Sequence, residues 1–140
     1  MINYFIGAIV VFATATNSIK QAEMYFDIPQ GLLNAICHTE SKLNVAANTP
    51  KDGGPHTSVG LCQIQLRTAR GLGFTGSEEE LAHPGVNAIY AAKYLSKQAK
   101  RYGSWIHAIS AYNMGSLKQK NGQYINQSYV DAVLTKWRSN

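Results

Sequence analysis

The sequence LLNAICHTE, residues 32–40, combines a helical apolar pattern with a single carboxylate at its end. Positions 33, 36, 37 and 40 recur at spacings of three and four, which places them on one face of an α-helix. If that face packs into the protein, Glu40 points into the interior or a cleft; if the helix end is exposed, Glu40 faces solvent. A carboxyl group that loses contact with water ionises less readily, so the first arrangement would let Glu40 act as an acid near neutral pH.

Helical patterns also dominate on both sides of this segment. The expected helices cover residues 18–26, 30–41, 68–72, 85–102 and 105–112, followed by a final helix around 129–137. Ser77 and Glu80 have the spacing of a capping box, and Gly103 is typical of a helix end. Residues 115–127 are polar and predict a loop.

Residues 44–60 have a different character, since turn-forming residues replace the helical pattern. Asn48, Pro50, Asp52, Gly53, Gly54 and Pro55 mark a loop or a small irregular sheet. Residues 60–66 (GLCQIQL) are either a strand or the entry to a helix. The expected fold class is therefore α+β and predominantly α-helical, with a small irregular β element near residues 45–65.

The chain has 140 residues, which suits one domain, and 13 Lys plus Arg against 8 Asp plus Glu give a net charge of +5. A basic protein is attracted to polyanions, which include nucleic acid, anionic lipid and bacterial cell wall. Lys93, Lys97, Lys100 and Arg101 form the densest basic group. No nucleic-acid motif accompanies them, so we expect a solvated helix face and no nucleic-acid partner.

The N-terminal segment is apolar and uncharged. Residues 4–13 read YFIGAIVVFA, and Ala13-Thr14-Ala15 has the small-x-small form of a signal cleavage site. The first expectation is a signal peptide over residues 1–15, export to the periplasm or beyond, and a mature domain over 16–140. An uncleaved membrane anchor and a buried N-terminal helix are the alternatives, although the run is shorter than the roughly 20 residues of a membrane span.

Three short motifs resemble those of soluble lytic transglycosylases and goose-type lysozyme relatives. Residues 40–44 (ESKLN) match E-S-x-x-N, residues 60–64 (GLCQI) resemble G-L-M-Q-I with cysteine for methionine, and residues 111–115 (AYNMG) resemble A-Y-N-A-G. The segment from Pro84 to Leu95, with Asn87, is also similar to the family. The resemblance implies a lysozyme-like fold and cleavage of the β-1,4 bond between N-acetylmuramic acid and N-acetylglucosamine in peptidoglycan. The product it implies is a 1,6-anhydromuramoyl end.

The resemblance also implies the site residues. Glu40 would be the single catalytic acid and base, and the hydroxyl of Tyr112 would bond its carboxyl group. Asn113 would orient the substrate amide, Gln63 would donate to the substrate N-acetyl group, and Ser58 would contact substrate. From their pattern alone, Tyr112 reads equally as a core aromatic and Gln63 as a polar residue on the wet face of a strand.

Asp52 decides between two reaction types. As a second carboxylate opposite Glu40 it would make the protein a hydrolytic muramidase. Asp52-Gly53 is also a standard turn dipeptide, and we favour the turn. A catalytically silent glycan-binding or structural component of a secretion or phage apparatus is the third alternative.

Cys37 and Cys62 are two small buried hydrophobes or a disulfide, and the family resemblance places both near Glu40. We expect no metal and no cofactor, since the four histidines His38, His56, His83 and His107 and the two cysteines lack the usual zinc spacings. The expected partners are glycan strands and components of a secretion or phage apparatus, and the expected state is a monomer.

Overall fold

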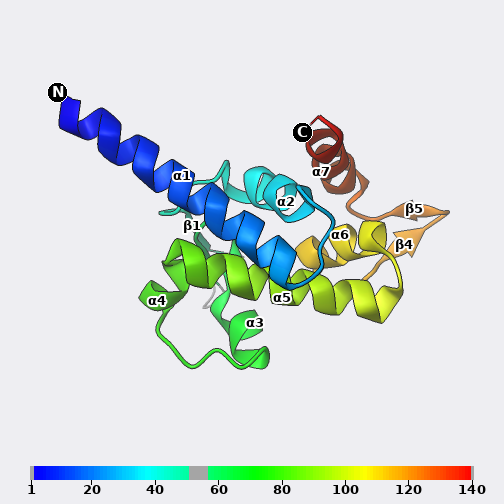
Figure 1. Ribbon diagram of the computed structural model, residues 1–140. Helices are drawn as coiled ribbons and strands as arrows, with labels where there is room; N and C mark the ends of the chain where they lie inside the picture. Colours follow the sequence, from blue (N-terminus) through cyan, green and yellow to red (C-terminus); the bar gives the residue numbers. More distant parts are fainter. Residues whose placement is uncertain (1, 51–56, 140) are drawn as a thin grey trace.

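A computed structural model describes residues 2–50 and 57–139 (Figure 1). The elements, in chain order, are α1 (Ile2–Tyr25), α2 (Leu32–Ser41), β1 (Asn48–Pro50), β2 (Thr57–Val59), β3 (Ile64–Gln65), α3 (Leu66–Gly71), α4 (Glu78–Ala82), α5 (Pro84–Tyr102), α6 (Trp105–Met114), β4 (Gln119–Lys120), β5 (Gln123–Tyr124) and α7 (Gln127–Arg138). The expected class, a mostly helical α+β fold with a small β element near residues 45–65, is confirmed.

The main core lies among the longer helices. Helix α5 packs against α1 on one side and α6 on the other, and α7 packs against α2 and α6 (Figure 1). Fully buried apolar side chains from these helices form one cluster, which includes Leu33, Ile36, Leu95, Ile109 and Val133. A second, smaller cluster under α4 is built around Val59 and Leu81. Helix α2 is therefore a central element, enclosed by α1, α5 and α7.

Helix α1 is longer than the helix expected at residues 18–26, since it begins at Ile2. Ala15, Ile19 and Ala22 pack into the core. Among the described residues, no helix combines the length and the hydrophobicity that crossing a bilayer requires.

Helix α2 begins at Leu32, three residues after Pro29, because a side chain from α1 caps it. Gly31 has a φ of 84°, and its backbone N–H donates to Oε2 of Glu23 at 3.0 Å. The N–H of Asn34 donates to Oε1 of the same carboxylate at 3.0 Å. Helix N-termini favour negative charge and need acceptors for their first N–H groups, so the buried Glu23 fixes the start of α2 against α1.

The β element is a small antiparallel sheet of order β1-β2-β3. Ser58 pairs with Thr49 on one side and with Gln65 on the other. Strand β3 leads directly into α3, so both interpretations of residues 60–66 were partly right. The capping box is also found, since the N–H of Glu80 donates to Oγ of Ser77 at 3.1 Å.

The segment expected as a loop at residues 115–127 contains a second hairpin. Lys120 pairs with Gln123, and Asn121 and Gly122 form the turn with φ values of 54° and 74°. Two consecutive positive φ angles are typical of a type I′ turn, for which Asn-Gly is the favoured dipeptide. The Asn-Gly signal was present in the sequence, but the flanking strands are too short and polar to show an alternating pattern.

A buried side chain of α5 makes hydrogen bonds to the loop between β2 and β3. Asn87 of α5, fully buried, accepts from the N–H of Cys62 at 2.8 Å and donates to the carbonyls of Val59 at 2.8 Å and Leu81 at 2.9 Å. A Cβ atom at Gly60, where φ is 72°, would lie 2.8 Å from Nδ2 of Asn87. Gly60 is therefore required both by its backbone conformation and by the close approach of Asn87.

We predict that Asn87→Ala lowers the free energy of unfolding by about 3 kcal/mol, because it leaves three buried backbone groups without a partner. Chemical denaturation measures this. Asn17→Ala, at an exposed position of α1, is the matched control and should change stability by less than about 0.5 kcal/mol. Equal effects of the two substitutions would show that Asn87 does not hold the loop.

Candidate active site

Glu40 lies half-buried in the last turn of α2. The helix ends immediately after it, since Lys42 and Leu43 adopt left-handed conformations with φ values of 55° and 61°. Oε1 of Glu40 accepts a hydrogen bond of 2.7 Å from the hydroxyl of Tyr129 on α7. The sequence left open whether Glu40 faces the protein or solvent. In the structure, its carboxyl group faces a neighbouring helix, α7.

Two tyrosines surround this carboxyl group. Burial, and then the negative charge of Glu40, raise the pKa of Tyr129 well above its ordinary value, and the same two causes act in the same order on the pKa of Tyr112. Both hydroxyl groups therefore remain protonated and act as donors at neutral pH. Tyr129 is therefore a fixed donor to the Glu40 carboxyl group.

The hydroxyl of Tyr112 donates to a backbone carbonyl, a contact that the sequence did not predict. Its ring is buried, with 7% exposed, and its hydroxyl donates to the carbonyl of Cys62 at 2.7 Å. Tyr112 consequently joins α6 to the loop between β2 and β3, while its ring packs against Tyr94 with the centroids 5.3 Å apart.

The same loop is tied to the end of α2. Oγ of Ser41, the residue after Glu40, donates to the carbonyl of Leu61 at 2.6 Å. Cys37 and Cys62 are joined as a disulfide, with their Cα atoms 4.1 Å apart. Residues 40–44 and 60–64, which are far apart in sequence, thus form one rigid unit beside the carboxyl group.

A small polar cavity of about 160 Å³ opens next to this unit. Its lining includes Ser58, Gln63, Tyr112 and Asn113, the four residues expected to contact substrate. Glu40 is not among the described residues that line it, but Tyr112, whose ring lines the cavity, is close enough to respond to the Glu40 charge. The structure therefore brings the four side chains together at one cavity, and Tyr112 links that cavity electrostatically to Glu40.

Gln63 and Asn113 present particular ends of their amides to this cavity. Nε2 of Gln63 donates to the carbonyls of Ala47 at 3.0 Å and Gly60 at 2.9 Å, so its oxygen is the end that can meet a ligand. Oδ1 of Asn113 accepts from Nδ2 of Asn126 at 3.0 Å, so its NH₂ group is the end that can donate. The expectation that Gln63 donates to the substrate thus changes to one in which it accepts.

Two residues of this site were missed from the sequence, Tyr129 and Asn126. Tyr129 lies in the final helix expected around residues 129–137, and the one signal in the sequence was that a buried tyrosine hydroxyl usually finds a hydrogen-bond partner. Asn126 bonds Ser110 in both directions, accepting from Oγ at 2.7 Å and donating to the carbonyl at 3.1 Å, and so aligns Asn113. Neither residue lies in the three motifs.

Asp52 lies outside the described residues. Within residues 2–50 and 57–139, no three His, Cys, Asp or Glu side chains are grouped so that they could hold a metal ion. The described chemistry of the site is therefore one carboxyl group, two neutral phenol donors and a small amide-lined cavity. Such a site can move one proton to and from a bound, uncharged ligand.

Comparison with known proteins gives one family and several relatives. The model of the transglycosylase SLT domain matches residues 17–132. Protein IpgF of Shigella flexneri is 35% identical over 120 residues, covering 84% of this chain and 76% of the relative. Invasion protein IagB of Salmonella typhimurium is 32% identical over 121 residues, covering 84% of this chain and 73% of the relative.

The disulfide gives a prediction for material exported into an oxidising compartment. Thiol counting on the denatured, unreduced protein should find no free thiol, and reduction should lower the free energy of unfolding by about 3 kcal/mol, the entropic value for a loop of this size. The same chain kept in a reducing cytosol is the control and should show two free thiols. Two free thiols in the exported protein would contradict the bridge.

Proposed function

This chain belongs to the transglycosylase SLT domain family, and on that basis we propose that it cleaves the β-1,4 bond between N-acetylmuramic acid and N-acetylglucosamine in peptidoglycan. The proposed product is a 1,6-anhydromuramoyl end, and Glu40 is the single acid and base. The observation that supports the proposal is that Glu40, bonded by Tyr129, acts electrostatically on Tyr112, which lines a cavity together with Ser58, Gln63 and Asn113.

The reaction proceeds in two steps with one carboxyl group. Glu40 gives its proton to the glycosidic oxygen as the bond from that oxygen to C1 of the muramoyl sugar breaks. The N-acetyl carbonyl oxygen of the same sugar bonds to C1 and forms an oxazolinium. The Glu40 carboxylate then takes the proton of the C6 hydroxyl as that oxygen bonds to C1 and the ring of the oxazolinium opens.

These two steps consume no water and return the proton to Glu40. Glycosidases that add water need a second carboxylate as base or nucleophile. Here the substrate supplies both nucleophiles, and attack within one molecule has a high effective concentration. One carboxyl group is therefore sufficient. In this proposal Asp52 is a turn residue and takes no part in the reaction.

The neighbouring side chains have positioning roles in this scheme. Tyr129 donates to Oε1 and stabilises the carboxylate that exists between the two steps. Tyr112 fixes residues 60–64 against α6 through its bond to the carbonyl of Cys62, so that the cavity keeps its shape. The NH₂ group of Asn113 donates to the N-acetyl carbonyl, Oε1 of Gln63 accepts from an N-acetyl N–H, and Ser58 contacts the sugar from β2.

We place this activity outside the cytoplasm, where peptidoglycan lies. The family match begins at residue 17, directly after the proposed signal peptide of residues 1–15, so cleavage there would leave the matched domain whole. One relative is named an invasion protein, and this supports a role for wall cleavage in an invasion-associated system over general wall turnover.

We predict that Glu40→Gln lowers the rate of peptidoglycan solubilisation by about 10⁴-fold, the upper range for one general acid–base group, because the amide cannot transfer the proton. Turbidity of purified sacculi measures the rate. Asp52→Asn is the matched control and should stay within a few fold of the unmodified protein. Near-normal lysis by Glu40→Gln would exclude Glu40, and a large loss with Asp52→Asn would favour the muramidase.

We also predict that Tyr129→Phe lowers kcat by about tenfold with little change in KM, because a hydrogen bond to a charged group is removed and the substrate contacts stay. Tyr124→Phe removes a hydroxyl bonded to His107 at 2.6 Å, away from Glu40, and serves as the control. A pure KM effect, or equal losses in both variants, would show that Tyr129 does not position Glu40.

A further inference from the structure

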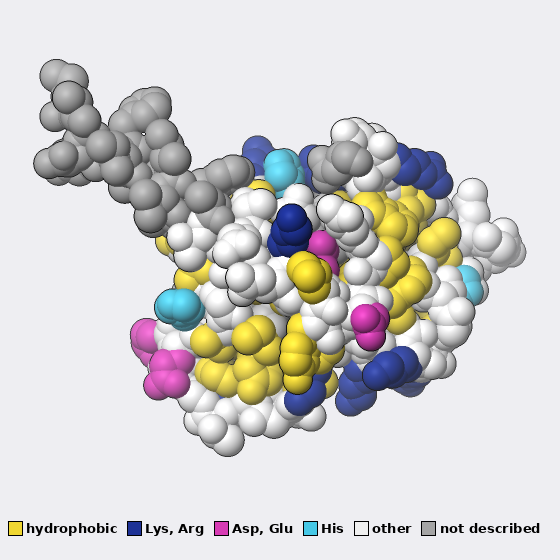
Figure 2. Space-filling model, viewed as in Figure 1, with side chains coloured by type: hydrophobic (Ala, Val, Ile, Leu, Met, Phe, Trp, Pro, Cys, Tyr) yellow, Lys and Arg dark blue, Asp and Glu magenta, His cyan; other side chains and the backbone are white. Residues whose placement is uncertain are grey.

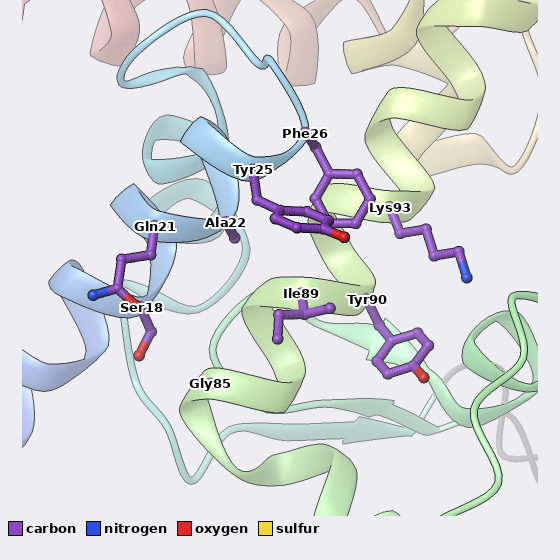
Figure 3. A pocket seen from close by; sticks show the side chains of 9 residues that line it. All are labelled: Ser18, Gln21, Ala22, Tyr25, Phe26, Gly85, Ile89, Tyr90 and Lys93. Carbon is purple, nitrogen blue, oxygen red and sulfur yellow. The ribbon is translucent and has the colours of Figure 1, made fainter.

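A large open cavity lies between α1 and α5, separate from the cavity beside Glu40. Its volume is about 590 Å³, more than three times that of the site cavity. Figure 3 shows the rings of Tyr25 and Phe26 on its α1 side and Ile89, Tyr90 and Lys93 on its α5 side. The proposed reaction uses none of these residues.

A second cavity, of about 380 Å³, continues along the same helices. Phe26 lines both cavities, so its side chain stands between them. Tyr90 and Ala99 of α5 line them, and the other lining residues from α5 and its C-cap are Gly85, Ile89, Lys93, Ser96, Lys100 and Gly103. These six recur every three or four positions, which is one face of the helix, and they span about 27 Å at 1.5 Å per residue. We call this face the α1–α5 groove.

The α1–α5 groove exposes apolar side chains to an unusual degree for a small domain. Tyr25 is 81% exposed and packs only its edge against Phe26, with ring centroids 5.0 Å apart. Ile89, on the α5 side of the groove, is 49% exposed. Figure 2 shows hydrophobic side chains gathered over the part of α5 next to α4. Contiguous exposed apolar surface of this kind marks a binding face.

Positive charge accompanies the apolar surface. Lys93 and Lys100 line the groove, and Lys97 lies exposed on the turn between them. Within the described part of the chain, none of the three forms an ion pair, although Nζ of Lys93 donates to the carbonyl of Leu72 at 2.6 Å. Asp27 is the one acidic residue among the described residues that line the two cavities. The groove therefore favours a partner that carries negative charge beside an apolar stripe.

We propose that the α1–α5 groove binds an acidic amphipathic helix of a partner protein. The apolar stripe of that helix packs between Tyr25, Phe26 and Ile89, and its carboxylates face Lys93, Lys97 and Lys100. An apolar groove of this length is the surface into which such helices dock, with anchors at i, i+3, i+4 and i+7. The basic cluster that the sequence showed thus acquires a role in protein recognition.

Two other occupants fit less well. An uncharged glycan could bond Ser18 and Gln21 in the wall, but it would bring no negative charge to the row of lysines. A second copy of this chain, with a net charge of +5, would bring like charges together at the row of lysines. An acidic helix meets neither objection.

The test uses a labelled, end-blocked alanine-based peptide of about 18 residues, the length of the groove at 1.5 Å per residue, with leucines at i, i+3, i+4 and i+7 and glutamates beside them. Fluorescence anisotropy with the folded chain should show saturable binding that weakens with salt. The same peptide with lysines for glutamates should bind at least about tenfold more weakly, because it meets the lysine row with like charge.

Two variants locate the binding. Ile89→Glu should weaken binding of the glutamate peptide by at least about tenfold, because it places a charge on the apolar wall, while Ile125→Glu, at an equally exposed isoleucine elsewhere, should not. Lys100→Glu leaves the apolar wall intact and should weaken the glutamate peptide while strengthening the lysine peptide. Circular dichroism and peptidoglycan solubilisation confirm that each variant is folded.

Three results would overturn the proposal. The first is equal binding of the two peptides, or none. The second is unchanged binding by Ile89→Glu. The third is that Ile89→Glu abolishes dimer formation, measured by sedimentation, or abolishes binding to sacculi while no peptide binding is found. Either outcome would assign the groove to another occupant. None of these results depends on Glu40, so the proposed reaction can stand or fail separately.

Discussion

Helix α2 is fixed at both of its ends by side chains from other parts of the chain, and the position of Glu40 depends on this. At its start, the Glu23 carboxylate of α1 accepts from the N–H groups of Gly31 and Asn34. At its end, Ser41 donates to the carbonyl of Leu61, and Cys37 is joined to Cys62. A helix held in this way cannot slide or rotate without breaking a buried polar contact, so its last turn presents the carboxyl group in one place.

The contacts around Glu40 connect elements that are distant in sequence. Tyr129 is 89 residues from Glu40, and Tyr112 is 50 residues from Cys62. Helices α6 and α7 therefore contribute donors, while the sheet and its following loop contribute the cavity wall. Asn87 secures that loop from α5, so each of the main helices holds one part of the site. Site geometry and global stability are coupled for this reason, and substitutions in the supporting residues should affect both.

Much of the fold followed from local patterns in the sequence. The helices α2, α5, α6 and α7 were predicted from apolar periodicity, the cap of α4 from Ser77 and Glu80, and the β element from a cluster of turn residues. What sequence patterns could not give were contacts between distant elements. The cap of α2 comes from Glu23, and a donor to Glu40 comes from Tyr129, which lies outside the three motifs. Motifs name residues that lie close along the chain, whereas hydrogen-bond partners are set by packing.

In the proposed reaction, the substrate's own C6 hydroxyl, not water, attacks C1 in the last step. Digesting purified peptidoglycan in water enriched in heavy oxygen, followed by mass spectrometry of the released muropeptides, tests it most directly. The account predicts anhydro ends that are lighter by one water than reducing ends and that carry no heavy oxygen. Reducing muramic acid ends that carry the heavy isotope would contradict it, because they would show that water attacks C1.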